Sequence, residues 1–144
     1  MAIKTVSINA TQLDGYKMEA RVGQHIAIVD QPVSGGGTDS GPSPLDYLLI
    51  SLAGCIVTIG HIIARQRRIP IKNIEVRVEG DIDTDVLMGK KSDSRSGFSA
   101  IRVVTNIDAD MSLEEKKSFL HEIDLRCPIS DNINNLTPIE FLVE

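Results

Sequence analysis

The sequence contains no tryptophan, three phenylalanines and two tyrosines, and it has two cysteines among its 144 residues. The scarcity of aromatic side chains argues against the stacking platforms that bind sugars or single-stranded nucleic acid. Cys55 and Cys127 lie 72 positions apart, so they form no CxxC motif and supply too few ligands for a cysteine-based structural zinc site. The net charge of -5 provides no overall basic field for a phosphate backbone, which disfavours nucleic acid as a partner.

Long apolar segments are also missing. No stretch approaches the ~20 consecutive apolar residues of a membrane span, and the first residues alternate polar and apolar side chains where a signal peptide needs an apolar run. We therefore expect a cytoplasmic protein with no membrane partner. The length and the 42% of hydrophobic residues are those of one ordinary globular domain, so a single domain over residues 1–144 is predicted.

The first thirty residues predict an antiparallel meander of three short strands, separated by turns at Asp14-Gly15 and Gly23. The predicted strands are Ile3–Ala10, Tyr16–Val22 and His25–Asp30. The following segment, Gln31–Ser43, is so rich in glycine, serine and proline that it is expected to be a loop.

The strongest helix signal follows this loop. Ser43 is placed as the N-cap, Pro44 occupies the first helical position and Asp46 comes three residues after the cap. Apolar residues cover nearly the whole circumference from Leu45 to Ile63, a pattern typical of a buried helix. A chain this small cannot cover such a helix alone, so we expect a homodimer with the helix Pro44–Arg65 in or near its interface.

The second half of the chain predicts a strand hairpin, a second helix and a last strand. Alternating side chains indicate two paired strands with a polar tip between them, and Ser112 with Glu115 forms a capping-box pattern at the start of a helix. The predicted elements are the strands Ile71–Asp83 and Phe98–Asp110, the tip Gly89–Gly97, the helix Ser112–Cys127 and the strand Thr137–Val143. The fold class is therefore α+β, in the order βββαββαβ.

The two cysteines are the candidate chemical groups, and each allows two interpretations. Cys55 lies in the buried helix, where a free thiol usually packs as a small hydrophobic side chain. Cys127 precedes Pro128, which can open a new helical turn with Cys127 at its N-cap, where backbone N–H groups favour a thiolate. If the fold brings the two together, one can be oxidised to a sulfenic acid and captured by the other as a disulfide.

These residues resemble a known family. The run GGGTDSGPSPLDYLLISLAGC, from Gly35 to Cys55, followed by Cys-Pro-Ile-Ser at residues 127–130, is similar to the superfamily of osmotically inducible protein C (OsmC) and organic hydroperoxide resistance (Ohr) proteins. The segments GPSPLDYLL and VDQPVSGGG resemble its OsmC-like branch. The resemblance implies an intertwined homodimer in which antiparallel sheets wrap paired central helices and each active site lies at the dimer interface.

The resemblance also implies a thiol peroxidase. Cys55 matches the thiolate that attacks an organic hydroperoxide, and Cys127 matches the thiol that resolves the resulting sulfenic acid. A small dithiol of the dihydrolipoamide type would then reduce the disulfide, and no cofactor is expected. The alternative is a non-catalytic OsmC-like dimer that binds or senses a small apolar or electrophilic ligand.

One departure concerns the groups that activate the first cysteine. Members of the family use an arginine, which lowers the thiol pKa, and a glutamate that holds this arginine. Here Leu45 stands where Ohr and OsmC proteins carry the glutamate, and the acid is shifted to Asp46, which either serves in a rearranged pair or merely caps the helix. Arg21 is the candidate arginine and Arg126 a second positive charge to consider, although Arg21 also fits a solvated strand residue.

Histidines and glycines suggest no further chemistry. His61 follows Cys55 by six residues and so lies off its helical face, which disfavours a Cys–His pair. His25 and His121 form no metal-binding spacing, and Gly35–Gly41 contains no phosphate-binding motif. We expect no metal site, and we expect this loop to cover a pocket or cross to the partner subunit.

Overall fold

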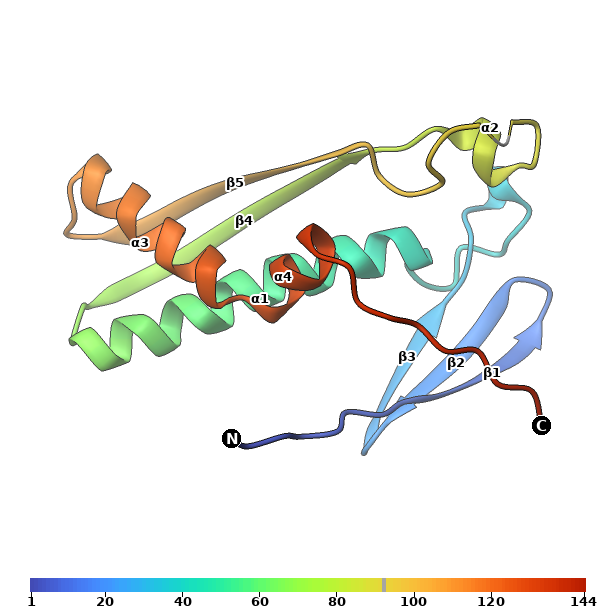
Figure 1. Cartoon of the computed structure of the whole chain (residues 1–144), viewed down its shortest axis with the longest axis horizontal. Helices are drawn as coiled ribbons and strands as arrows, with labels where there is room; N and C mark the ends of the chain where they lie inside the picture. The colour runs from blue at the N-terminus through green and yellow to red at the C-terminus, as the bar shows by residue number, and fades with distance from the viewer. Residues whose placement is uncertain (92) are drawn as a thin grey trace. The chain divides into compact units, whose positions relative to one another are not determined.

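The structure is a computed structural model that describes residues 1–91 and 93–144 and divides into two compact units, Met1–Leu48 and Leu49–Glu144 (Figure 1). The boundary falls inside the long helix α1 (Pro44–Arg67), five residues into it. The sheets are antiparallel and are combined with helices, so the predicted α+β class is confirmed.

The first unit contains the predicted meander. Its strands β1 (Asn9–Asp14), β2 (Lys17–Val22) and β3 (His25–Val29) form one antiparallel sheet in that order. Gly15 and Gly23 adopt φ values of 53° and 58° at the two turns. Such positive values are easily reached without a Cβ atom, which explains why the turns occur where the sequence predicted them.

The first predicted strand, Ile3–Ala10, was wrong in its position. The strand β1 starts at Asn9, which is paired with Arg21, and it runs on to the turn at Asp14. The turn fixes which residues of the two strands lie opposite each other. Because β2 ends one residue after Arg21, the alternating residues before Asn9 extend past the end of their neighbour and have no strand to pair with.

The loop after β3 is organised by one carboxylate. Asp30 is 1% exposed and its side chain accepts hydrogen bonds from Gln31 N, Thr38 N, Thr38 Oγ1 and Ser40 N. These bonds favour the charged form, with the Thr38 hydroxyl the largest contribution, and they hold the pKa of Asp30 well below its usual value. At Gly37 a Cβ atom would lie 2.1 Å from the Gln31 carbonyl oxygen, so the loop closes on itself where no side chain fits.

The start of α1 matches the prediction. Ser43 Oγ accepts the Asp46 backbone N–H at 3.2 Å, and Asp46 Oδ2 accepts the Ser43 backbone N–H at 2.8 Å. The two bonds are those of a capping box, with aspartate in place of the more common glutamate. Two N–H groups that the helix itself leaves unpaired are thereby satisfied.

The second unit is built on a two-stranded sheet of β4 (Ile71–Asp81) and β5 (Ala100–Ala109), as predicted. One turn of helix, α2 (Thr84–Leu87), which the alternation did not predict, follows β4. The predicted tip Gly89–Gly97 includes Ser92, which lies outside the described residues. After β5 come the helices α3 (Leu113–Arg126), with the predicted capping box of Ser112 and Glu115, and α4 (Pro128–Asn134).

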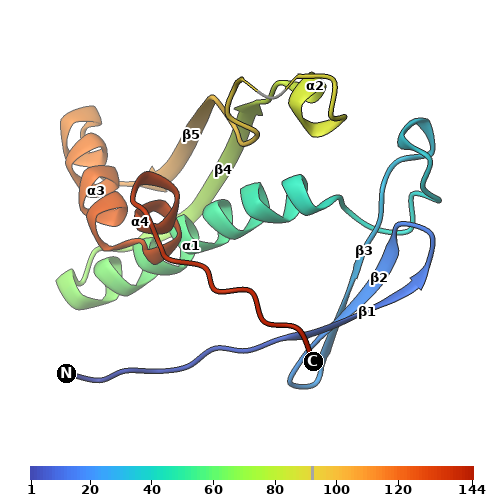
Figure 2. The same ribbon diagram turned by 45° about the vertical axis from the view of Figure 1, so that its right-hand side comes forward.

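The core of the second unit lies between these helices and the sheet. Figures 1 and 2 show α1, α3 and α4 on the same side of the β4–β5 sheet. The helix α1 is the one element of the described residues that is long and apolar enough to cross a membrane by length and composition, but its buried residues pack within this core. The buried cluster consists of Leu52, Ile56, Ile63, Ala64, Ile74, Ile107, Phe119, Ile123 and Cys127.

The last predicted strand was not found. In the described part of the chain, Thr137–Val143 has no regular secondary structure, and Ile139, Phe141, Leu142 and Val143 are exposed. Alternating side chains indicate a face suited to a sheet, but a strand also needs a neighbour that pairs with its backbone N–H and C=O groups. This segment pairs with neither sheet of its own chain.

Candidate active site

The second unit brings the two cysteines into contact. Cys127 Sγ and Cys55 Sγ lie 2.7 Å apart, and both are free thiols. A disulfide bond measures about 2.05 Å, so the two sulfurs are in contact and are not bonded to each other. Cys55 is half-buried and Cys127 is 1% exposed. The sequence left open whether these thiols are separate bystanders or a pair, and the structure places them as a pair.

The position of Cys127 follows from the helices on either side of it. Cys127 is at once the C-cap of α3 and the N-cap of α4, and Pro128 opens α4 as the sequence predicted. Its sulfur accepts the backbone N–H of Ser130 at 3.3 Å. Proline suits the first position of a helix because it has no N–H to satisfy there. The chain therefore turns sharply at Cys127 and presents the thiol to α1.

The surroundings of Cys55 favour its protonated form. Burial raises the pKa of the Cys55 thiol, and the hydrogen bond with Cys127 raises it further, while a backbone hydrogen bond from Ile129 acts in the opposite direction. A thiolate is the nucleophilic form of cysteine. A positive charge or a further hydrogen-bond donor beside Cys55 would increase its thiolate fraction at neutral pH.

Two of the predicted activating residues belong to the first unit, where each has a partner. Arg21 lies on β2, is 63% exposed and forms an ion pair with Glu19 at 2.9 Å. Asp46 caps α1 through Ser43, and the hydrogen bonds from the Ser43 side chain and backbone lower its pKa. The capping interpretation of Asp46 is thus realised, and catalytic roles for Arg21 and Asp46 stay predictions.

Arg126 is adjacent to Cys127 in sequence, but its charge is used elsewhere. Its guanidinium donates to Gln66 Oε1 at 3.0 Å and pairs with Glu122 Oε1 at 3.6 Å. Gln66 lies near the C-terminal end of α1, and Glu122 lies on α3. Arg126 therefore ties these two helices together.

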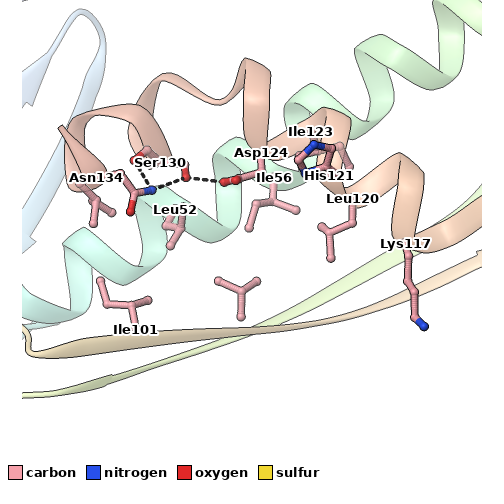
Figure 3. Close-up of a pocket in the computed structure, with 12 residues that line it drawn as sticks. Leu52, Ile56, Ile101, Lys117, Leu120, His121, Ile123, Asp124, Ser130 and Asn134 are labelled. Carbon is pink, nitrogen blue, oxygen red and sulfur yellow. Dashed lines mark hydrogen bonds between the residues drawn. The ribbon is translucent and has the colours of Figure 1, made fainter. Parts of the chain in front are cut away.

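The second unit contains a pocket of about 460 Å³, which neither cysteine lines (Figure 3). Leu52 and Ile56, which flank Cys55 on α1, form part of its wall, and Ser130, whose N–H reaches Cys127, lines its polar end. The other apolar side chains of the wall are Ile101, Val103, Leu120, Ile123 and Ile133. The lining also includes the charged or polar side chains of Lys117 and His121. The volume is typical of sites for small organic molecules.

The polar end of the pocket was not predicted from the sequence. Figure 3 shows Asp124, Ser130 and Asn134 joined by hydrogen bonds: Ser130 Oγ donates to Asp124 Oδ1, and Asn134 Nδ2 donates to Ser130 Oγ at 3.2 Å and to Ser130 O at 3.0 Å. Ser130 is buried. Its place in the first turn after Cys-Pro is the signal that could have revealed it.

Comparison with known proteins identifies the family of this chain and relatives that share its fold. The sequence model of the OsmC family, described as OsmC-like protein, matches residues 37–141. Among the curated proteins, none matches the sequence. An OsmC-like protein from Mycoplasma pneumoniae has a similar structure, with a TM-score of 0.80 and 25% identity over 92% of this chain and 89% of that one.

Two further solved structures share the fold at lower identity. An organic hydroperoxide resistance protein OsmC from Legionella pneumophila has a TM-score of 0.67 at 17% identity, covering 92% of this chain and 91% of its own. An organic hydroperoxide resistance protein from Elizabethkingia anophelis has a TM-score of 0.64 at 18% identity, and the match covers 90% of this chain and 89% of that one. Since the family match spans most of the sequence and the fold agrees, the chain belongs to the OsmC-like family, within the OsmC/Ohr superfamily.

Proposed function

We propose that this protein is a thiol-dependent peroxidase that reduces organic hydroperoxides to alcohols, with Cys55 as the nucleophile and Cys127 as the resolving thiol. The observation that carries the proposal is the 2.7 Å contact between the two sulfurs. Cys55 is the more exposed of the two and is the one a substrate can reach first. Family membership and the names of the Ohr relatives support a peroxide-related role.

The proposed reaction has three balanced steps. The Cys55 thiolate attacks the distal oxygen of the hydroperoxide, the O–O bond breaks, and the alkoxide leaves as the alcohol after taking up a proton. Cys127 then attacks the sulfur of the Cys55 sulfenic acid, and the S–O bond breaks with release of water. A small dithiol of the dihydrolipoamide type restores both thiols by exchange and is itself oxidised to a disulfide.

Because the pKa of Cys55 is raised, a positive charge beside this thiol would favour the first step. We assign this part to Arg21, with Asp46 holding the guanidinium, because the family resemblance places an arginine and an acid beside the first cysteine. In such an arrangement, Asp46 would replace Glu19 as the ion-pair partner of Arg21, or both acids would pair with it. Asp46 would still accept the hydrogen bond from the Ser43 backbone N–H. A cation beside the departing alkoxide also stabilises the transition state.

We further propose that residues 1–144 form one domain of a cytoplasmic homodimer, in keeping with free thiols in a reducing compartment. Apolar residues are exposed on α1, where Ile50 is 51% exposed, and in the C-terminal segment. A second copy of the chain would bury them, which supports the homodimer. Sedimentation velocity at micromolar concentration is expected to give twice the chain mass of 15.7 kDa. Ile50→Glu is expected to shift the distribution toward the monomer, whereas Ser118→Glu, on an exposed face of α3, is not. A monomeric wild-type protein would contradict the homodimer.

Rapid mixing with peroxide tests the proposed activity. The fully reduced protein is mixed with a slight excess of cumene hydroperoxide or of hydrogen peroxide, free thiols are counted over time, and disulfides are mapped by mass spectrometry. We expect both thiols to disappear together with formation of a Cys55–Cys127 bridge, faster with the organic peroxide because the side chains packed around Cys55 are apolar. Protein alkylated at both thiols is the control. If both thiols survive in the unmodified protein, the proposal is wrong.

The second candidate function is binding or sensing of a small apolar or electrophilic ligand without turnover. The pocket of about 460 Å³ favours it, since neither sulfur is among the residues that line that pocket. Under this function, a ligand would raise the unfolding temperature while peroxide would not be consumed. The same rapid-mixing experiment separates the two functions.

A further inference from the structure

The hydrogen bonds around Ser130 join the resolving thiol to two helices. Ser130 Oγ donates to Asp124 Oδ1, which lies in the last turn of α3, while the Ser130 backbone N–H donates to Cys127 Sγ from the first turn of α4. Asp124 also accepts the Cys127 N–H through its backbone oxygen, at 3.2 Å. The corner at Cys127 is therefore bridged both by its backbone and by the side-chain bond from Ser130 to Asp124.

This arrangement places a donor against the sulfur that must react second. This hydrogen bond orients Cys127 Sγ, which is the sulfur that attacks the sulfenic acid in the proposed reaction. The Ser130 N–H can donate to Cys127 Sγ only while Ser130 stays close to this sulfur. The hydrogen bond from the Ser130 side chain to Asp124 restrains Ser130 in that position. Asn134 Nδ2 satisfies the remaining lone pair of the Ser130 hydroxyl from the far end of α4, at 3.2 Å.

We infer that Ser130 and Asp124 are positioning residues for the resolving step: their side-chain hydrogen bond fixes the Ser130 N–H on Cys127 Sγ and aligns this sulfur with Cys55. The inference rests on the proposed function. In the step concerned, Cys127 gives up its proton and its sulfur forms the bond to the Cys55 sulfur. The S–O bond of the sulfenic acid breaks, and the leaving hydroxide takes up a proton to become water.

Two substitutions isolate the bridge between the helices. Ser130→Ala removes the hydroxyl and keeps the backbone N–H. Asp124→Ala removes the acceptor of the same hydrogen bond, and because Asp124 is exposed, this substitution is less disruptive to folding than one at the buried Ser130. Asp124→Asn keeps an acceptor oxygen and is the conservative variant. Ser118→Ala, an exposed serine on the same helix α3, is the matched control.

The test measures the two oxidation steps separately. Formation of the Cys55 sulfenic acid is followed by dimedone trapping after mixing with cumene hydroperoxide, and disulfide formation by acid quenching and mass spectrometry. For Ser130→Ala and Asp124→Ala we expect disulfide formation to slow about tenfold or more relative to sulfenic acid formation in the same variant, because misalignment of reacting atoms is costly. Asp124→Asn and Ser118→Ala should form the disulfide at nearly the wild-type rate.

A second oxidant separates failure of this inference from failure of the proposed function. Diamide joins two neighbouring thiols without peroxide chemistry, so it is used on the same variants. If the wild type ignores peroxide but Ser130→Ala and Asp124→Ala slow the diamide-driven disulfide, the peroxidase is wrong and the positioning role stands. If both alanine variants form the disulfide at the wild-type rate with either oxidant, the positioning role is overturned.

Discussion

Replacing Cys55 with serine is expected to abolish peroxide consumption, whereas Cys127→Ser is expected to complete one turnover and then stop. A serine hydroxyl stays protonated near neutral pH and is a far weaker nucleophile than a thiolate, so Cys55→Ser leaves nothing to attack the peroxide. In Cys127→Ser the sulfur of Cys55 is intact and can react once. Its sulfenic acid then persists, because the thiol that lies 2.7 Å away in the native protein is missing.

The measurement is the number of peroxide molecules consumed per chain, with and without a small dithiol. Without the dithiol, Cys55→Ser should consume none beyond a protein-free blank, and Cys127→Ser should consume one and yield a dimedone adduct on Cys55. With the dithiol, which can itself reduce a sulfenic acid, Cys55→Ser should still consume none. Each variant is the control for the other, because both remove one sulfur from the same contact. Equal activity of the two variants would refute the assignment of roles, and a reversed pattern would exchange them.

The largest loss of stability is expected for Phe119→Ala. Phe119 is 2% exposed on α3 and belongs to the cluster that holds α3 against α1 and the sheet. The Phe119 ring, Ile74 and Ile123 all lie within 4 Å of the place where a Cβ atom of Gly60 on α1 would be. Removal of a buried phenylalanine side chain costs about 3–5 kcal/mol, because the cavity that remains is only partly refilled.

Urea unfolding of the reduced protein measures this loss. The chain concentration must be the same for all variants, since association would add to the apparent free energy of unfolding. Ser118→Ala changes the neighbouring, exposed residue of the same helix and is expected to stay within about 0.5 kcal/mol of the wild type. A loss below about 1 kcal/mol for Phe119→Ala would show that this cluster does not hold the second unit together.

The helices were predictable because their signals are local. The capping boxes at Ser43 and Ser112, together with the proline after Cys127, mark helix ends within four residues of sequence, and all three ends occur as predicted. The positions of β1 and of the C-terminal segment were not predictable in this way. A strand requires a partner edge, and the end of β2 sets the limit of β1.

The site was predictable in part. Sequence spacing located Cys55 and Cys127 on their helices, but only the packing of α1 against the α3–α4 corner brings their sulfurs together. Ser130 and Asp30 escaped prediction for the same reason. Their hydrogen bonds join residues six and ten positions apart through turns whose geometry no periodicity encodes.

The contact between the two sulfurs also bears on how such a site resists damage. A cysteine sulfenic acid that meets a second peroxide is oxidised to the sulfinic acid, which thiols do not reduce. When the resolving thiol already touches the nucleophile, no rearrangement of helices has to precede its attack, and the two reactants have the very high effective concentration of an intramolecular pair. Under the roles proposed for the two cysteines, capture by Cys127 is then favoured over overoxidation even when peroxide is abundant.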